Sequence, residues 1–248
     1  MSGELALIIV GAACAGFVQG LAGFGFGLVS LSFWAWGLAP QQAAVLATVG
    51  GLTGQVLAAL TVRRGSSWTV LWPFLAGGLC GLPLGLWLLQ VADATWFRIF
   101  VGSLLALWCP LMLVSGRLPH FNRVGRWADT LAGAAGGVMG PLGGFTGAVP
   151  TLWCTLRGLD RDVQRAVIQH FNLAMLGLTT VAYLQRGLIT TAHLPDLGVV
   201  TVALLLPALL GMRLYTRISA VAFRNTVLGL LTASGLAMLA ATLPQLFR

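Results

Sequence analysis

The sequence predicts an all-α integral membrane protein made of two inverted repeats, and three observations support this. Hydrophobic residues make up 58% of the 248-residue chain and charged residues only 8%, whereas a soluble domain carries about 25% charged residues. The apolar runs are about 20 residues long or longer, which suits membrane-spanning helices better than barrel strands. A Gly-rich apolar motif occurs twice, at residues 16–27 and 136–147.

The two copies of the motif share four glycines at one constant offset. The matched pairs are Gly16 with Gly136, Gly20 with Gly140, Gly23 with Gly143, and Gly27 with Gly147. Each copy is too apolar for a water-exposed loop and too rich in glycine for an ordinary helix. A doubled, interrupted hydrophobic segment is the best pointer in a sequence to the substrate site of a transporter.

Eight apolar segments follow one another along the chain: 5–38, 41–62, 68–90, 96–115, 128–156, 163–184, 194–212 and 222–244. The first segment would be about 50 Å long as a straight helix, which exceeds the roughly 30 Å of a hydrocarbon core. The first and fifth segments have their glycines near the middle, so we expect each to form two short half-helices joined by a turn. The predicted organisation is a first repeat over 1–115, a cytoplasmic linker over 116–127 and a second repeat over 128–248.

The basic residues indicate how these segments cross the membrane. The formal net charge is +8, and all 14 basic residues are arginines that fall between the apolar runs. If all eight segments cross, the arginines divide equally between the two sides. If the fifth segment instead turns back within the membrane and leaves on the side from which it entered, eleven arginines lie on one side and three on the other. The positive-inside rule favours this second arrangement. Applying the same path to the first segment gives three crossings per repeat, inverted repeats and both termini outside.

Residues 20–27, Gly-Leu-Ala-Gly-Phe-Gly-Phe-Gly, resemble the opening of the sulfite exporter TauE/SafE family. The doubled organisation and the Arg-Gly turns at 64–65 and 186–187 are further similarities. The resemblance implies a multi-pass transporter of the bacterial inner membrane that moves sulfur-containing anions such as sulfite or organosulfonates. Pro141 and Thr146 stand in the second copy where the first has Leu21 and Phe26, so the two half-sites are expected to differ chemically.

The turns between the half-helices are the expected anion site. The start of a helix offers unpaired N–H groups and a partial positive charge, and glycine lets a ligand approach the backbone closely. For single glycines the alternative is small-xxx-small helix packing, and for the polar residues it is hydrogen bonding between helices. The residues predicted to bind substrate are Gln19, Gly20, Gly23, Gly25, Thr48, Gly140, Gly143, Gly144, Thr146, Gln169, His170 and Asn172.

The expected activity is export of an anion by alternating access. No acidic residue lies deep in a segment, so only His170 is available for a proton relay. An anion that leaves an inside-negative cell gains about 2.3 kcal/mol per charge per 100 mV, which favours a potential-driven exporter. An anion channel and an uptake permease for a related organic anion are the alternatives.

Other functional classes are not expected. The chain has no HExxH or GxSxG motif and no paired intramembrane carboxylates, so we do not expect an enzyme. We expect no cofactor and no metal, and the four cysteines show no metal-ligand spacing. The expected partners are a small anion and the lipid bilayer, without nucleic acid; a homo-oligomer is left open.

Overall fold

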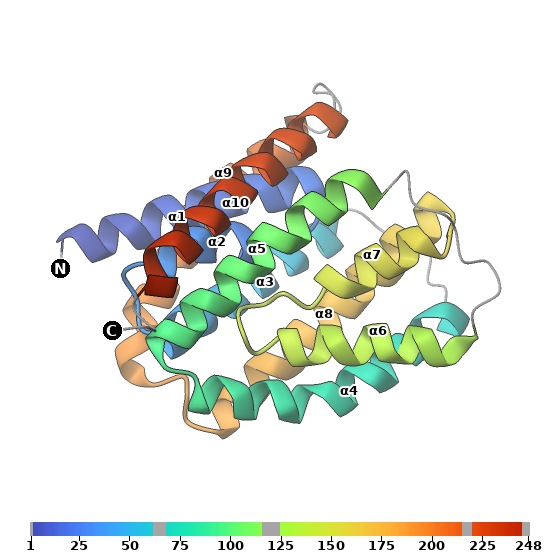
Figure 1. The fold of residues 1–248 in the computed structure, drawn as a ribbon, viewed down its shortest axis with the longest axis horizontal. Helices are drawn as coiled ribbons and strands as arrows, with labels where there is room; N and C mark the ends of the chain where they lie inside the picture. Colours follow the sequence, from blue (N-terminus) through green and yellow to red (C-terminus); the bar gives the residue numbers. More distant parts are fainter. Residues whose placement is uncertain (1, 62–67, 116–124, 215–219, 245–248) are drawn as a thin grey trace.

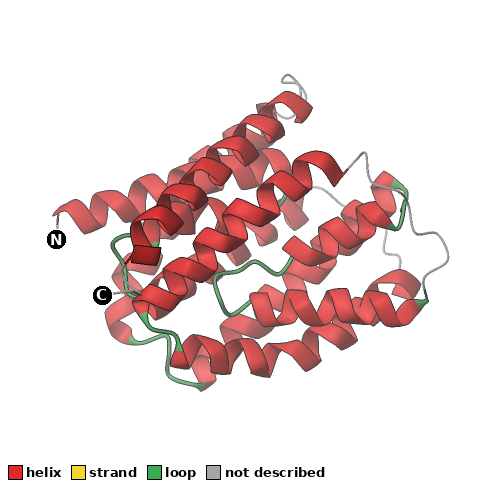
Figure 2. Cartoon of the chain, in the orientation of Figure 1, coloured by secondary structure: helices red, strands yellow, loops and turns green. Residues whose placement is uncertain are grey.

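The computed structural model describes residues 2–61, 68–115, 125–214 and 220–244. Every regular element in these ranges is helical (Figure 2). The predicted linker at 116–127 lies mostly outside the described residues, as do Arg63, Arg64, Arg117, Arg123, Arg217 and Arg248. The helices are α1 Ser2–Ala22, α2 Phe26–Trp34, α3 Pro40–Thr61, α4 Trp68–Val91, α5 Ala94–Val114, α6 Arg126–Met139, α7 Ala148–Leu156, α8 Arg161–Gln185, α9 Leu194–Leu214 and α10 Ala220–Thr242, with a 3₁₀ turn η2 at Thr191–His193.

Seven helical stretches in the described part of the chain are long and apolar enough to cross a membrane. They are α1, α3, α4, α5, α8, η2 with α9, and α10. The predicted all-α membrane class is therefore confirmed.

The first long segment folds back on itself. Gly23 and Gly25 separate α1 from α2, with φ angles of 80° and 96° that favour glycine because it lacks a Cβ. The indole Nε1 of Trp34, at the end of α2, donates to the backbone oxygen of Leu7 near the start of α1, at 3.1 Å. The chain thus returns beside its own beginning.

The second long segment makes the same turn. Gly143 and Gly144 lie between α6 and α7 with positive φ angles of 140° and 73°. Asp129, in the first turn of α6, accepts hydrogen bonds from Trp153 of α7 and from Arg157, which follows α7. The carboxylate therefore joins the start of α6 to the end of α7, and Figure 1 shows these two helix ends at the same end of the molecule.

The half-helix prediction is correct for the second segment and wrong for α1. Helices α6 and α7 have 14 and 9 residues, and α2 also has 9. Helix α1 has 21 residues, or about 31 Å of rise, and is itself a candidate span. Gly16 and Gly20 do not interrupt it because they lie against the backbone of Leu204 and Ala208 in α9.

Helices of the predicted first repeat pack mainly on helices of the predicted second repeat. Helix α1 packs along α9, α4 packs along α6, and α5 packs along α10. In the predicted repeats, α6 is the counterpart of α1 and α4 is the counterpart of α9. The α1–α9 and α6–α4 pairs are therefore equivalent, as a repeat predicts. The start of α1 and the end of α10 lie at one end of the molecule, while the start of α6 and the end of α7 lie at the other (Figure 1). The membrane orientation of the repeats stays a prediction.

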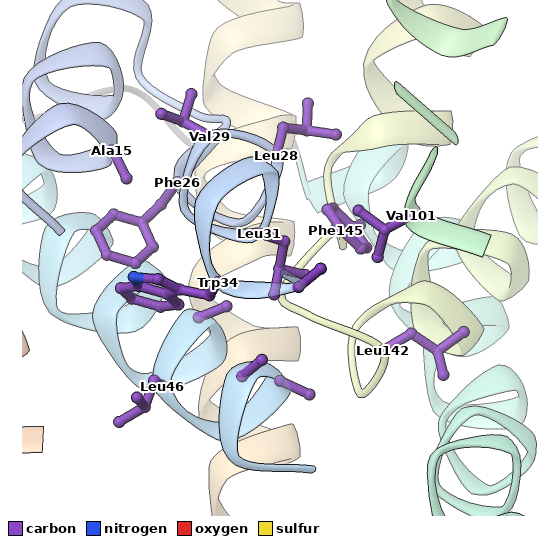
Figure 3. Close-up of a cluster of buried hydrophobic side chains, with 14 of the residues drawn as sticks. Ala15, Phe26, Leu28, Val29, Leu31, Trp34, Leu46, Val101, Leu142 and Phe145 are labelled. Atoms are coloured by element: carbon purple, nitrogen blue, oxygen red, sulfur yellow. The ribbon is translucent and has the colours of Figure 1, made fainter. Parts of the chain in front are cut away.

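Helix α2 lies in the middle of the main core. Seven of its nine residues are buried, which explains why it is apolar on all sides. Phe26 and Trp34 pack edge to face with ring centroids 6.1 Å apart, and Leu31 points toward the second break, near Phe145 (Figure 3). The core therefore fixes where α2 begins.

Candidate functional site

A small cavity lies between the two helix breaks. Its volume, counted as the space that the centres of water molecules can occupy, is about 20 Å³. No ionisable side chain lies among the described residues that line it. These residues are Gln19, Phe24, Gly25, Phe26, Gly27, Leu28, Gly51, Gln55, Gly144, Phe145, Thr146, Gly147, Ala148, Asn172 and Leu176.

Helices α2 and α7 both begin at this cavity. Their N-cap residues are Gly25 and Gly147, which as glycines supply no side chain to cap the first N–H groups. The first N–H groups of a helix have no partner within the helix and carry its partial positive charge. Helix α2 offers more of these donors, because α7 has Pro150 in its first turn, which has no N–H, and its Ala148 N–H donates to Phe145 O.

The two breaks touch each other through backbone atoms. A Cβ added to Gly27, at the start of α2, would lie 2.0 Å from the carbonyl oxygen of Gly143. A Cβ added to Gly143 would lie 2.2 Å from Leu31 Cδ1, also on α2. The start of α2 and the second break can be this close only because both positions lack side chains.

Asn172 of α8 supplies a polar side chain to the cavity. Thr146 Oγ1 donates to Asn172 Oδ1 at 2.8 Å, and the two residues are 1% and 3% exposed. Because the amide oxygen accepts this bond, the NH₂ group is the end of Asn172 that can donate to a ligand.

Two glutamines connect the first hairpin to α3. Gln19 Nε2 donates to Gly51 O at 2.9 Å, and Gln55 Nε2 donates to Gly23 O at 3.0 Å. The Oε1 atoms of both side chains are buried without a hydrogen-bond partner. Gln19 Oε1 lies against Gly54, where an added Cβ would be 2.1 Å away.

The second break is buried more deeply than the first. Tyr183 of α8 is fully buried and donates to the carbonyl oxygen of Pro141. Thr48 Oγ1 lies 3.5 Å from both Gly140 O and Tyr183 OH. In the first break, by contrast, Gly23 is exposed, and an added Cβ there would meet nothing within 4 Å. The protein therefore encloses the cavity less completely on the side of the first break.

The structure brings together part of the predicted site. Five predicted residues line the cavity: Gln19, Gly25, Gly144, Thr146 and Asn172. Four lie directly behind this lining. Gly23 accepts from Gln55 and Gly143 touches Gly27. A Cβ added to Gly140 would lie 3.0 Å from Thr146, and one added to Gly144 would lie 3.4 Å from the Cα atom of Thr48.

The remaining three predicted residues are neither in the lining nor among the four behind it. Gly20 serves the contact between α1 and α9, since an added Cβ would lie 2.1 Å from Ala208 O. Gln169 is buried in α8. His170 Nδ1 lies 2.7 Å from the carbonyl oxygen of Ala166, one turn earlier in α8.

Ten lining residues were not among those predicted: Phe24, Phe26, Gly27, Leu28, Gly51, Gln55, Phe145, Gly147, Ala148 and Leu176. Gln55 carries a usable signal, since it is a glutamine within an apolar helix. Gly27 and Gly147 belong to the repeated motif. The apolar residues carry no signal beyond their closeness to the glycines.

Comparison with known protein families decides what kind of protein carries this site. The family model described as "Sulfite exporter TauE/SafE" matches residues 7–238, nearly the whole chain. The chain belongs to the sulfite exporter TauE/SafE family. It is therefore a membrane transporter by family, with the multiple apolar helices that this role requires. Comparisons with curated proteins and with solved structures found no match.

Proposed function

We propose that this TauE/SafE member exports small sulfur-containing oxyanions, such as sulfite or organosulfonates, and binds them between the two helix breaks. One observation carries the proposal: two uncapped helix N-termini begin at one cavity, and no ionisable side chain of the described residues lines it. N–H groups in this arrangement suit an oxyanion.

The absence of a charged side chain from the lining suits transport. Each helix start contributes the equivalent of roughly half a positive charge, and the Asn172 amide adds a neutral donor. Such donors compensate an anion without the strong attraction of a buried arginine. A site that holds its ligand only moderately can also release it, as a carrier must.

Anion binding requires the two breaks to move apart. The cavity volume of about 20 Å³ is close to the 10–15 Å³ that a single water molecule needs, and an oxyanion has four or more heavy atoms. The hairpins pack on different partners, α1 with α9 and α6 with α4. We propose that these two units rock against each other, so that the site opens alternately to each side of the membrane.

We further propose that the protein lies in the bacterial inner membrane with inverted repeats and both termini outside. The arginine distribution supports this orientation. The membrane potential then favours export, because each negative charge that leaves gains about 2.3 kcal/mol per 100 mV.

Flux measurements in proteoliposomes test the proposal. The purified chain is reconstituted with sulfite inside, and a potassium gradient with valinomycin sets the membrane potential. We expect saturable efflux that accelerates when the interior is negative and is stimulated by sulfite on the far side. Efflux that ignores the potential and requires a proton gradient would contradict potential-driven export. Non-saturable flux without trans-stimulation would indicate a channel.

A further inference from the structure

We propose that the anion recognised at this cavity carries its own hydrogen-bond donor. The class is a monoanion with an O–H or N–H group on the central atom, such as a hydrogen oxyanion, and Gln55 Oε1 accepts from that group. This inference rests on the anion site proposed above and narrows its ligand: the singly protonated form of sulfite fits, whereas a simple organosulfonate has no such donor and does not.

The orientation of the Gln55 amide is set by its neighbour. Its nitrogen donates to Gly23 O at 3.0 Å, and a carbonyl oxygen can only accept, so the amide oxygen points the other way. Gln55 is 2% exposed and lines the cavity, and its Oε1 has no hydrogen-bond partner.

Of the other two amides at the cavity, one is already partnered and the other is packed against protein. Asn172 Oδ1 already accepts from Thr146. Gln19 Oε1 is unpartnered, but it lies against Gly54 of α3. Gln55 Oε1 is therefore the acceptor that remains for a ligand among the side-chain amides of the lining.

A fully deprotonated oxyanion fits this arrangement poorly. Such an anion presents only acceptor oxygens, so Gln55 Oε1 would face another partially negative oxygen and would stay without a hydrogen bond. Leaving a buried acceptor without a hydrogen bond costs free energy. A ligand with one donor group satisfies Gln55 while its remaining oxygens accept from the start of α2 and from Asn172. A metal cation is disfavoured, because such ions take about six oxygen ligands and this lining offers mainly N–H donors.

Two anions of equal charge and nearly equal size provide the test. Sulfamate and methanesulfonate are both sulfonate monoanions, and sulfamate has an NH₂ group where methanesulfonate has a methyl group. Titration calorimetry on the full chain in detergent measures the Kd of each. We expect sulfamate to bind about tenfold more tightly, the effect of one hydrogen bond to a buried acceptor.

The variant Gln55→Met removes the acceptor and should bring the two Kd values together. Gln19→Met is the comparison variant, since it removes the other unpartnered amide oxygen of the lining and an equivalent bond to α3 but leaves Gln55 Oε1 in place. It should keep the preference for sulfamate; loss of the preference in Gln19→Met alone would assign the acceptor to Gln19 and overturn the role of Gln55. If Gln55→Met does not fold, the comparison on the unmodified chain decides alone.

The outcomes separate this inference from the proposed function. Equal affinity for both anions, or tighter binding of methanesulfonate, overturns the donor requirement and leaves the anion site standing. Binding of neither anion, with sulfite also failing to bind, overturns the anion site itself. A sulfamate preference that survives in Gln55→Met would show that another group accepts the bond.

Discussion

The contact between Gly27 and Gly143 gives the sharpest mutational prediction. In Gly27→Ala the new Cβ would lie 2.0 Å from Gly143 O, where an ordinary contact begins at 3.4 Å. The start of α2 and the second break must therefore separate by about 1.4 Å. Because Gly143 O is backbone, no flexible side chain can absorb the shift.

The expected cost is about 1–3 kcal/mol of stability, as for other overpacked interiors. It is partly offset by the preference of helices for alanine over glycine, about 1 kcal/mol. The displaced α2 donors should also weaken sulfite binding by about tenfold, since hydrogen bonds lose strength steeply as their geometry worsens.

Thermal unfolding in detergent and sulfite titration measure both effects. Gly177→Ala is the control, because this glycine is also helical, does not line the cavity, and an added Cβ would meet nothing within 4 Å. We expect Gly177→Ala to be neutral or stabilising. A Gly27→Ala protein as stable as the Gly177→Ala protein, with unchanged sulfite affinity, would refute the close contact between the breaks.

Three further substitutions separate binding from packing. Asn172→Leu removes a cavity donor and should raise the sulfite Kd about tenfold, measured by titration; an unchanged Kd would remove Asn172 from the site. Arg157→Gln breaks the ion pair with the buried Asp129 and should lower stability by about 2 kcal/mol, measured by denaturant unfolding in detergent. Gly20→Ala places a Cβ 2.1 Å from Ala208 O and should lower the melting temperature without changing the sulfite Kd. A changed Kd would show that Gly20 contributes to sulfite binding as well as to the α1–α9 contact.

The sequence predicted the helices well because their signals are strong and local. The segment expected at 68–90 forms α4 at Trp68–Val91, and the segment expected at 41–62 forms α3 at Pro40–Thr61. Hydropathy over about 20 residues decides such spans. The breaks were also visible, because two of the four break glycines with positive φ, Gly23 and Gly143, belong to the repeated glycines. The other two, Gly25 and Gly144, lie within two residues of them.

The length of α1 could not be read in the same way. Gly16 and Gly20 look like helix breakers in the sequence, yet they are close-packing positions against α9. Which role a glycine takes depends on the helix that packs on it, and α9 lies about 190 residues later in the chain. The local sequence around Gly16 and Gly20 gives no information about this partner helix.

The site was only partly predictable for a related reason. Gln19, Thr146 and Asn172 stand out as polar residues in apolar segments, and all three line the cavity. His170 stands out equally but bonds within its own helix. Rotation of α8 about its axis decides between Asn172 and His170, and that rotation is fixed by packing against α3 and α4.

Locating a bound anion would test the central claim most directly. Selenite, a heavier analogue of sulfite, can be placed from the anomalous scattering of selenium in crystals of the full chain. We predict one selenium position between the start of α2 and Asn172, with ligand oxygens within hydrogen-bonding distance of the Phe26–Leu28 amides. Selenite bound elsewhere, with both helix starts covered by protein alone, would contradict the account.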